Sequence, residues 1–223
     1  EMRKNFVANA SHELKTPITI IKGFAETLHD NPGLDMEVVQ GITSKIVRNC
    51  DRMDTLVRNL LRLADIENLP ISQLSSCNFL DVLESCKQML PPVYPDAIVE
   101  FIKENSGPYD IIADPDLLEL AIKNLFENAA KYSKGPAKIT VITKRLENNI
   151  LIKVSDKGIG IPQEDIEHIF QKFYTVDKAH SRKLGGSGLG LSIVETIIHK
   201  HKGTITLESE VGVGSTFNIM LPV

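Results

Sequence analysis

The chain has 223 residues, of which 42% are hydrophobic and 24% charged, a composition typical of a globular protein with one or two domains. Its net charge of -4 gives no positive field that would attract a nucleic acid, so we expect no nucleic-acid partner. The three cysteines show neither a CxxC pair nor the spacing of a zinc site. Scattered cysteines of odd number are typical of a protein in the reducing cytosol.

Membrane and targeting segments are not visible in the sequence. No hydrophobic run approaches the roughly 20 residues that a membrane-spanning helix needs, and no signal peptide is present. We therefore expect a cytoplasmic chain without membrane contact. The sequence opens at Glu1 directly into a helical pattern, so we also expect a fragment of a longer protein. A membrane anchor elsewhere in that longer protein is compatible with this expectation.

Two long amphipathic helices are predicted in the first third of the chain. Residues 1–29 and 35–68 both carry hydrophobic side chains at helical spacing, and the turn cluster at 30–33 separates them. A hairpin of two such helices has too small a core to be stable alone. Pairing two copies into a four-helix bundle would bury both hydrophobic stripes, and we therefore predict a homodimer.

A polar segment at 69–78 is predicted to be an irregular linker between this hairpin and a region of mixed helices and strands. Beyond it, helices are predicted at 79–90, 115–132 and 189–201, and strands at 98–102, 111–112, 137–145, 149–155, 203–209 and 215–221. Together these elements predict one sheet with helices packed on one face, an α/β sandwich. The predicted organisation is one domain at 1–70 and a second at 71–223.

The first chemical pattern is a histidine that is predicted to point away from the packing stripe of its helix. At about 100° per residue, His12 lies roughly 160° from Leu14, and Thr16 shares its outward face one turn later. A neutral imidazole can act as a nucleophile. Glu13 is in a position to accept a hydrogen bond from Nδ1–H, which would leave the Nε2 lone pair for attack. An ordinary solvent-exposed histidine is the competing interpretation.

The second pattern lies on the helix predicted at 115–132. Asn124, Asn128 and Lys131 fall on one side of it, at i, i+4 and i+7, and the aromatic Tyr132 follows. An amide oxygen is a suitable ligand for Mg²⁺, a lysine pairs with phosphate, and an aromatic ring can lie against a base. Two asparagines that cap the helix or face solvent are the simpler alternative for this helix alone.

A short glycine motif follows the strand predicted at 149–155. Asp156 is placed to accept a hydrogen bond from an exocyclic amine, and Gly158 and Gly160 would let a ligand approach the backbone closely. The Rossmann pattern fails, because its third glycine position is Gln163. A plain strand-to-helix turn is the structural alternative.

A second glycine stretch contains Gly186, Gly188 and Gly190 and opens the last predicted helix. Exposed N–H groups at such a helix start can bind an anion. The stretch is not a Walker loop, because no Gly-Lys-Ser/Thr follows it. The polar, cationic segment before it, at about 170–186, has the length of a lid that closes over bound phosphates.

Five short motifs, taken in their order along the chain, resemble those of the sensor histidine kinase family. They are SHELKTP at 11–17, NLFENAAKYS at 124–133, DKGIGIP at 156–162, FQKFY at 170–174 and GGSGLGLSIV at 185–194. The resemblance covers essentially the whole chain and is most similar to kinases of the phosphate-sensing type. It implies a dimerisation and histidine phosphotransfer hairpin at 1–70. It also implies an ATP-binding domain at 71–223, with the Bergerat sandwich shared with gyrase and Hsp90-like ATPases.

The resemblance also implies a role for each matching residue. His12 matches the phosphoacceptor, Glu13 the acidic residue that assists it, and Thr16 the position that orients water when the phosphorylated partner is hydrolysed. Asn128 matches the Mg²⁺ ligand, and Asp156 the carboxylate that reads adenine. The remaining matches, on the phosphate side, beside the base, in the glycine loops and in the lid, are Asn124, Lys131, Tyr132, Gly158, Gly160, Gly186, Gly188, Gly190 and Arg182.

The implied reaction is ATP-dependent phosphorylation of His12, followed by transfer to an aspartate on the receiver domain of a response regulator. The implied cofactors are ATP and Mg²⁺, and phosphatase activity toward the partner is also expected. One alternative is a degenerate kinase that acts only as a binding scaffold, which would be expected to lack His12, Asn128 or a glycine motif. Another is a Bergerat-fold ATPase, which needs no outward nucleophile.

Overall fold

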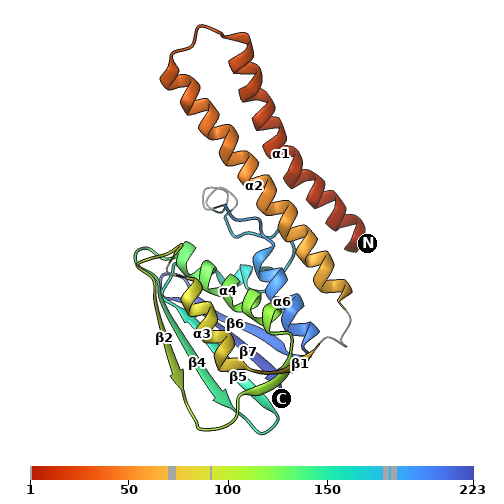
Figure 1. Ribbon diagram of the computed structural model, residues 1–223, viewed down its shortest axis with the longest axis vertical. Coiled ribbons are helices and arrows are strands. Elements are labelled where there is room, and N and C mark those ends of the chain that lie inside the picture. Colours follow the sequence, from red (N-terminus) through yellow and green to blue (C-terminus); the bar gives the residue numbers. More distant parts are fainter. Residues whose placement is uncertain (1, 70–73, 91, 178–180, 182–184) are drawn as a thin grey trace.

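The structure is a computed structural model that describes residues 2–69, 74–90, 92–177, 181 and 185–223. Two long helices form an extended hairpin, and beside its open end lies a sheet with helices on one face (Figure 1). This arrangement confirms the predicted fold class, a helical hairpin followed by an α/β sandwich. Among the described helices, none combines the length and hydrophobicity that crossing a bilayer requires.

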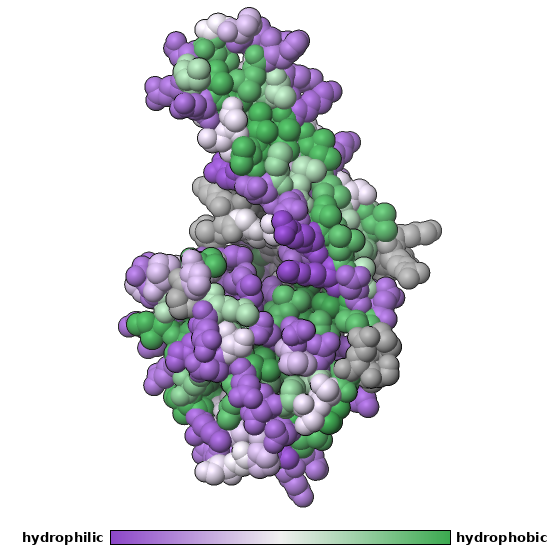
Figure 2. All heavy atoms as spheres, viewed as in Figure 1, coloured by the Kyte–Doolittle hydropathy of each residue, from purple (hydrophilic) through white to green (hydrophobic). Residues whose placement is uncertain are grey.

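The hairpin consists of α1 (Met2–Asp30) and α2 (Met36–Asn68), which agree with the predicted ranges to within one residue at each described end. Ile42, Leu56, Leu63 and Ile66 are the buried residues of α2. Other large hydrophobic side chains of the hairpin stay exposed in the single chain, and hydrophobic residues gather along it in Figure 2. These exposed side chains are Val7, Ile18, Ile20, Met36, Val38, Val47, Val57 and Leu61. A single hairpin therefore leaves much of its hydrophobic surface in water.

The linker prediction is wrong for the second half of the segment at 69–78. Ser75–Asn78 forms a short strand, β1, which pairs antiparallel with β3 (Asp110–Ala113) in a two-stranded sheet. The expected single sheet is therefore two sheets. The strand escaped prediction because it is short and contains two exposed serines, so no hydrophobic alternation marks it. The side chain of Asn78 then caps the next helix by accepting a hydrogen bond from Leu80 N–H at 3.0 Å.

The main sheet has five strands in the order β2-β4-β5-β7-β6. Its strands are β2 (Ile98–Lys103), β4 (Lys138–Arg145), β5 (Asn149–Asp156), β6 (Thr204–Glu210) and β7 (Gly214–Pro222). The pair β2–β4 is parallel, and the other pairs are antiparallel. One face is covered by α3 (Phe79–Met89), α4 (Pro115–Lys131) and α6 (Gly190–Lys200) (Figure 1). Alternate residues of β4 and β5 are buried beneath these helices, as a sheet with one covered face requires.

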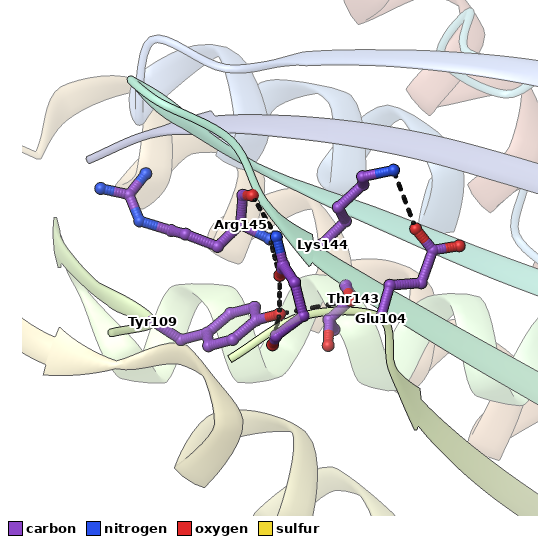
Figure 3. Close-up of polar contacts among 6 residues, drawn as sticks. Glu104, Tyr109, Thr143, Lys144 and Arg145 are labelled. Atoms are coloured by element: carbon purple, nitrogen blue, oxygen red, sulfur yellow. Dashed lines mark hydrogen bonds and ion pairs between the residues drawn. The ribbon is translucent and has the colours of Figure 1, made fainter. Parts of the chain in front are cut away.

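A cluster of polar contacts holds the loop between β2 and β3, residues 104–109, against the end of β4 (Figure 3). Tyr109 is fully buried, and its hydroxyl lies 3.1 Å from Asn105 Oδ1 and 3.3 Å from the carbonyl oxygen of Thr143. Asn105 Nδ2 donates to the carbonyl of Arg145 at 2.7 Å, and Arg145 N–H donates back to Asn105 Oδ1 at 2.9 Å. These bonds satisfy the buried hydroxyl and leave the other end of the sheet for the site.

The helices α4 and α6, which carry most of the site, are joined by a buried histidine. His201 Nε2 accepts a hydrogen bond from Asp114 N–H at 2.9 Å, and Nδ1 lies 2.8 Å from the carbonyl of Ile197. The side chain of Asp114 caps α4 by accepting from Asp116 N–H and Leu117 N–H. The start of α4 and the end of α6 are therefore held at a fixed separation.

Candidate active site

The histidine motif lies on the exposed side of α1. His12 is exposed, and Thr16 Oγ1 donates to the backbone carbonyl of His12 at 3.2 Å. Glu13 turns toward the second helix, where Oε2 lies 3.1 Å from Nη2 of Arg52. These two side chains are only 22% and 16% exposed, so the ion pair is partly shielded from solvent. Glu13 thus lies next to His12 and is tied to α2.

Most of the residues predicted for a nucleotide site line one cavity of about 840 Å³ between α2, α4, α6 and the end of β5. Those lining it are Asn124, Asn128, Lys131, Tyr132, Asp156, Gly160, Gly186, Gly188 and Gly190. Gly158 lies just behind this lining and is buried. His12, Glu13 and Thr16 are not part of the lining, and Arg182 lies outside the described residues. The cavity volume is in the range of small-molecule sites.

One end of the cavity contains a partly buried carboxylate. Asp156 is the last residue of β5, and its Oδ1 accepts a hydrogen bond from Gly158 N–H at 2.7 Å. Burial raises the pKa of the Asp156 carboxyl, while hydrogen bonds from the backbone of Gly158 and Ser215 lower it. Tyr132, at the end of α4, lies at the same end of the cavity, and its carbonyl accepts from Ile159 N–H at 3.1 Å. A carboxylate beside an aromatic residue can recognise a base that carries an amine.

The glycines of the first motif are required by the protein itself. A Cβ at Gly158 would lie 2.8 Å from Asp156 Oδ1 and 2.9 Å from the carbonyl oxygen of Tyr132. Gly160 has a φ of +71°, and a Cβ there would lie 2.0 Å from the carbonyl oxygen of Glu210. The sequence predicted close approach of a ligand at these positions. In the structure the close approach is made by neighbouring protein atoms, which hold the loop against the β6–β7 turn.

The other end of the cavity combines α4 with the second glycine stretch. A Cβ at Gly190, the first residue of α6, would lie 3.2 Å from Oδ1 of Asn124. Gly188 has a φ of +69° and lies against the backbone of Phe173. Lys131 Nζ is 3.6 Å from Glu127 Oε2, and both side chains line the cavity. Backbone N–H groups at the start of α6 give this end the character of an anion site.

The residues present also fit a magnesium ion that is held mainly by a nucleotide. Among the described residues, no group of three or more histidine, cysteine or acidic side chains is placed to hold a metal. Asn128 lines the cavity from α4, between Asn124 and Tyr132 in the chain, and its amide oxygen is a hard neutral ligand. Magnesium usually keeps several waters and binds one or two protein ligands together with phosphates. Asn128 is therefore suited to that single position.

Sequence reasoning missed a contribution from the hairpin. Thr55, Asn59 and Arg62 of α2 line the same cavity, and Asn59 Nδ2 donates to Ser187 Oγ at 3.2 Å. The only signal in the sequence was a polar face on α2, which could equally have been solvent-exposed. Further contacts hold the two parts together, among them Lys172 Nζ, which lies 2.7 Å from Glu67 Oε1, and the rings of Phe6 and Phe173, which are 5.8 Å apart.

Family models match both parts of the chain. Residues 2–69 match the His Kinase A (phospho-acceptor) domain, and residues 113–223 match the histidine kinase-, DNA gyrase B- and HSP90-like ATPase family. The chain belongs to the sensor histidine kinases. The exposed histidine of this kinase chain therefore lies in a phospho-acceptor domain, and its cavity lies in an ATPase domain, which supports the use of ATP.

Known sensor kinases align with almost the whole chain. The sensor-like histidine kinase SenX3 of Mycolicibacterium smegmatis is 34% identical over 223 residues, which are 99% of this kinase chain and 57% of that protein. The sensor protein kinase WalK of Staphylococcus epidermidis is 34% identical over 226 residues, which are 99% of the chain and 36% of that protein. The chain therefore spans little more than half of these relatives at most.

Solved structures share the architecture of this kinase chain. The histidine kinase AdeS of Acinetobacter baumannii has a TM-score of 0.71 at 27% identity, with 95% of this chain and 97% of that chain covered. The histidine kinase ThkA, solved in complex with the response regulator protein TrrA, has a TM-score of 0.75 at 23% identity. That match covers 100% of this chain and 64% of ThkA, and it shows a common fold.

Proposed function

We propose that this chain uses Mg-ATP to phosphorylate His12 and then supplies the phosphoryl group to an aspartate of a response regulator. The observation that supports the proposal most strongly is the pairing of an exposed histidine in a phospho-acceptor domain with a cavity in an ATPase domain. We propose that the boundary between the two domains lies at about residue 70 and that both domains work in the cytoplasm. The remainder of the longer protein would then be the sensor.

In this proposal, different cavity residues bind different parts of the nucleotide. Asp156 accepts a hydrogen bond from the exocyclic amine of adenine, and Tyr132 lies beside the base. Asn128 holds the magnesium ion, while Asn124 and Lys131 contact the phosphate side. The metal ion supplies charge neutralisation on the phosphates when bound. The glycines from Gly186 to Gly190 offer backbone N–H groups, and Arg182 is the proposed cation of the lid.

The chemical step uses groups on α1. His12 Nε2 forms a bond to the γ-phosphorus as the bond to the leaving oxygen breaks, so ADP departs with the electron pair. Glu13 stabilises the positive charge that develops on the ring by accepting from Nδ1–H. Because Glu13 is tied to Arg52 in this structure, the carboxylate would turn toward the ring as the reaction begins. The aspartate of the partner then takes the phosphoryl group from His12.

The partners of the chain are also part of the proposal. The exposed hydrophobic side chains of the hairpin would be buried by a second copy, so we propose a homodimer. The outward face that carries His12 and Thr16 is available to a receiver domain. The ThkA structure, which contains a response regulator, has the same fold and supports this type of complex.

Incubation with γ-labelled ATP tests the proposed reaction against its two alternatives. Acid-labile label retained on the protein indicates a kinase, release of free phosphate alone indicates an ATPase, and neither result would leave a binding scaffold. A His12→Gln variant is the matched control, because it should lose the label but keep its affinity for ATP. Label that persisted in this variant would show that another nucleophile is at work.

A further inference from the structure

The cavity is completed by a polar face of α2. Thr55, Asn59 and Arg62 follow one another at i, i+4 and i+7, so they form one face of the helix, and all three line the cavity. The hairpin thus adds two amide or hydroxyl groups and one guanidinium to a site that is otherwise built by the ATPase domain. This addition depends on how the two domains are docked.

One hydrogen bond shows which end of the cavity α2 reaches. Asn59 donates to Ser187, which lies between Gly186 and Gly188 in the second glycine stretch. Gly190, at the start of α6, lies close to Asn124. The α2 face therefore lies at the end where backbone N–H groups favour an anion, and away from the carboxylate of Asp156.

The charges around this end leave a role for Arg62. On α4, the acidic Asp116 and Glu119 and the basic Lys123 and Lys131 all line the cavity, so a cation on the opposite wall, α2, would complete the positive charge around a polyphosphate. On α2, Arg52 pairs with Glu13 and Arg58 pairs with Asp54. Among the described residues, no ion pair involves Arg62. A guanidinium presents five donors in a planar fork that suits phosphate oxygens.

We propose that Arg62 and Asn59 of α2 bind the polyphosphate of the nucleotide while the two domains are docked as in this structure. The inference rests on the proposed ATP site and adds ligands from the hairpin to it. Because binding linkage is reciprocal, nucleotide that gains affinity from α2 also stabilises the docked arrangement by the same factor. ATP then stabilises the contact between the two domains and is also the substrate.

The position of Arg62 along α2 keeps the bound nucleotide away from His12, so we call the docked state a holding arrangement. Glu13 pairs with Arg52, so the level of His12 on the hairpin is close to that of Arg52. Asn59 and Arg62 follow Arg52 by seven and ten residues, which correspond to about 10 and 15 Å along a helix. Phosphates held at Arg62 are therefore two to three turns away from the histidine. The ATPase domain must leave this position before transfer to His12 of the same chain.

Calorimetry on the whole chain tests the assignment, with a non-hydrolysable ATP analogue and with adenosine as ligands. Arg62→Ala is expected to weaken binding of the triphosphate analogue about tenfold, as loss of one exposed charge-assisted contact implies, and to leave adenosine binding unchanged. Arg62→Lys should recover part of the loss. Arg58→Ala, an exposed arginine of the same helix that lies outside the cavity lining, is the charge-matched control and should bind both ligands normally.

The outcomes separate this inference from the proposed function. Asp156→Asn should weaken the analogue and adenosine alike, and unaltered binding in that variant would count against the ATP site itself. If Asp156→Asn weakens binding but Arg62→Ala does not, the site stands and the role of Arg62 is overturned. Equal losses for both ligands in Arg62→Ala would also overturn it, because they would indicate a general structural effect.

Autophosphorylation at different ATP concentrations gives a second readout. A holding contact contributes to affinity but not to transfer, so Arg62→Ala should raise the KM for ATP and leave the rate at saturating ATP equal or higher. A fall in the saturated rate of tenfold or more would show instead that Arg62 acts in the chemical step. That result would overturn the holding arrangement even if the affinity also fell.

Discussion

Substituting Gly160 by alanine tests how tightly the first glycine motif is built into the fold. Gly160 has a φ of +71°, and an ideal Cβ would lie 2.0 Å from the carbonyl oxygen of Glu210. The left-handed backbone alone costs an alanine about 1–2 kcal/mol. The overlap with a backbone atom cannot be relieved by a side-chain rotation, and forced overpacking adds about 1–3 kcal/mol. We expect Gly160→Ala to lower the free energy of unfolding by about 2–5 kcal/mol.

Gly212 provides the matched control in the neighbouring turn. Its φ is +84°, but a Cβ there would meet nothing within 4 Å. Gly212→Ala should therefore cost only the backbone term of about 1–2 kcal/mol. Urea denaturation of both variants, followed by the circular dichroism of the sheet domain, measures the difference. Equal losses in the two variants would refute the argument that contact with Glu210 fixes this loop.

Further variants test the carboxylate, the thiols and the histidine face. Burial raises the pKa of Asp156, so its charge opposes folding increasingly as pH rises through that pKa. Asp156→Asn should therefore gain thermal stability relative to the wild type as pH rises above the ordinary range of a carboxyl group, while ATP affinity falls about tenfold or more. A lower melting temperature at pH 8 would contradict this sign. Burial raises the pKa of Cys86 to about 12, so a thiol reagent should label exposed Cys50 in the native protein and Cys86 only in urea. Thr16→Ala should keep autophosphorylation within a few-fold but slow dephosphorylation of the partner about tenfold, because a methyl cannot orient water; parallel losses in both assays would remove Thr16 from the mechanism.

Much of the fold follows from periodicity along the sequence. The helices of the hairpin and the strands β4 and β5 are long, and their hydrophobic residues recur at the helical or the strand period, so their ranges agree with prediction to within one or two residues. The strand β1 carries no such signal, because Ser75 and Ser76 are exposed and the strand is paired on one side only. Its existence depends on β3, more than 30 residues later in the chain.

The sequence likewise predicts one part of the candidate site and not the other. Asn124 and Asn128 were predicted to share one side of a helix, and both line the cavity with Asp156, as a local pattern can indicate. The reason for Gly160 could not be predicted, because its close neighbour is Glu210, which is distant in sequence. The contribution of Asn59 also depends on a contact with a residue more than 120 positions away. Such contacts are decided by tertiary packing, which propensity and spacing do not encode.

The helix α2 connects these observations, because it meets the two functional centres at different levels. Arg52 holds the carboxylate beside His12, and Asn59 holds the glycine stretch at the phosphate end of the cavity. A rigid helix cannot bring these two levels together, since their separation of about 10 Å is set by its rise. Phosphoryl transfer to His12 of the same chain therefore requires the ATPase domain to slide or detach from α2. The contacts that must break include polar ones, Asn59 with Ser187 and Glu67 with Lys172, and the ring pair that includes Phe173. They also include buried hydrophobic side chains of α2, because Leu63 and Ile66 belong to the same buried cluster as the core of the ATPase domain. The exposed ion pair contributes little stability, whereas each buried hydrophobic side chain contributes about 1.5–3 kcal/mol. A signal that twists the hairpin therefore shifts the balance between holding and transfer mainly by disturbing this hydrophobic packing.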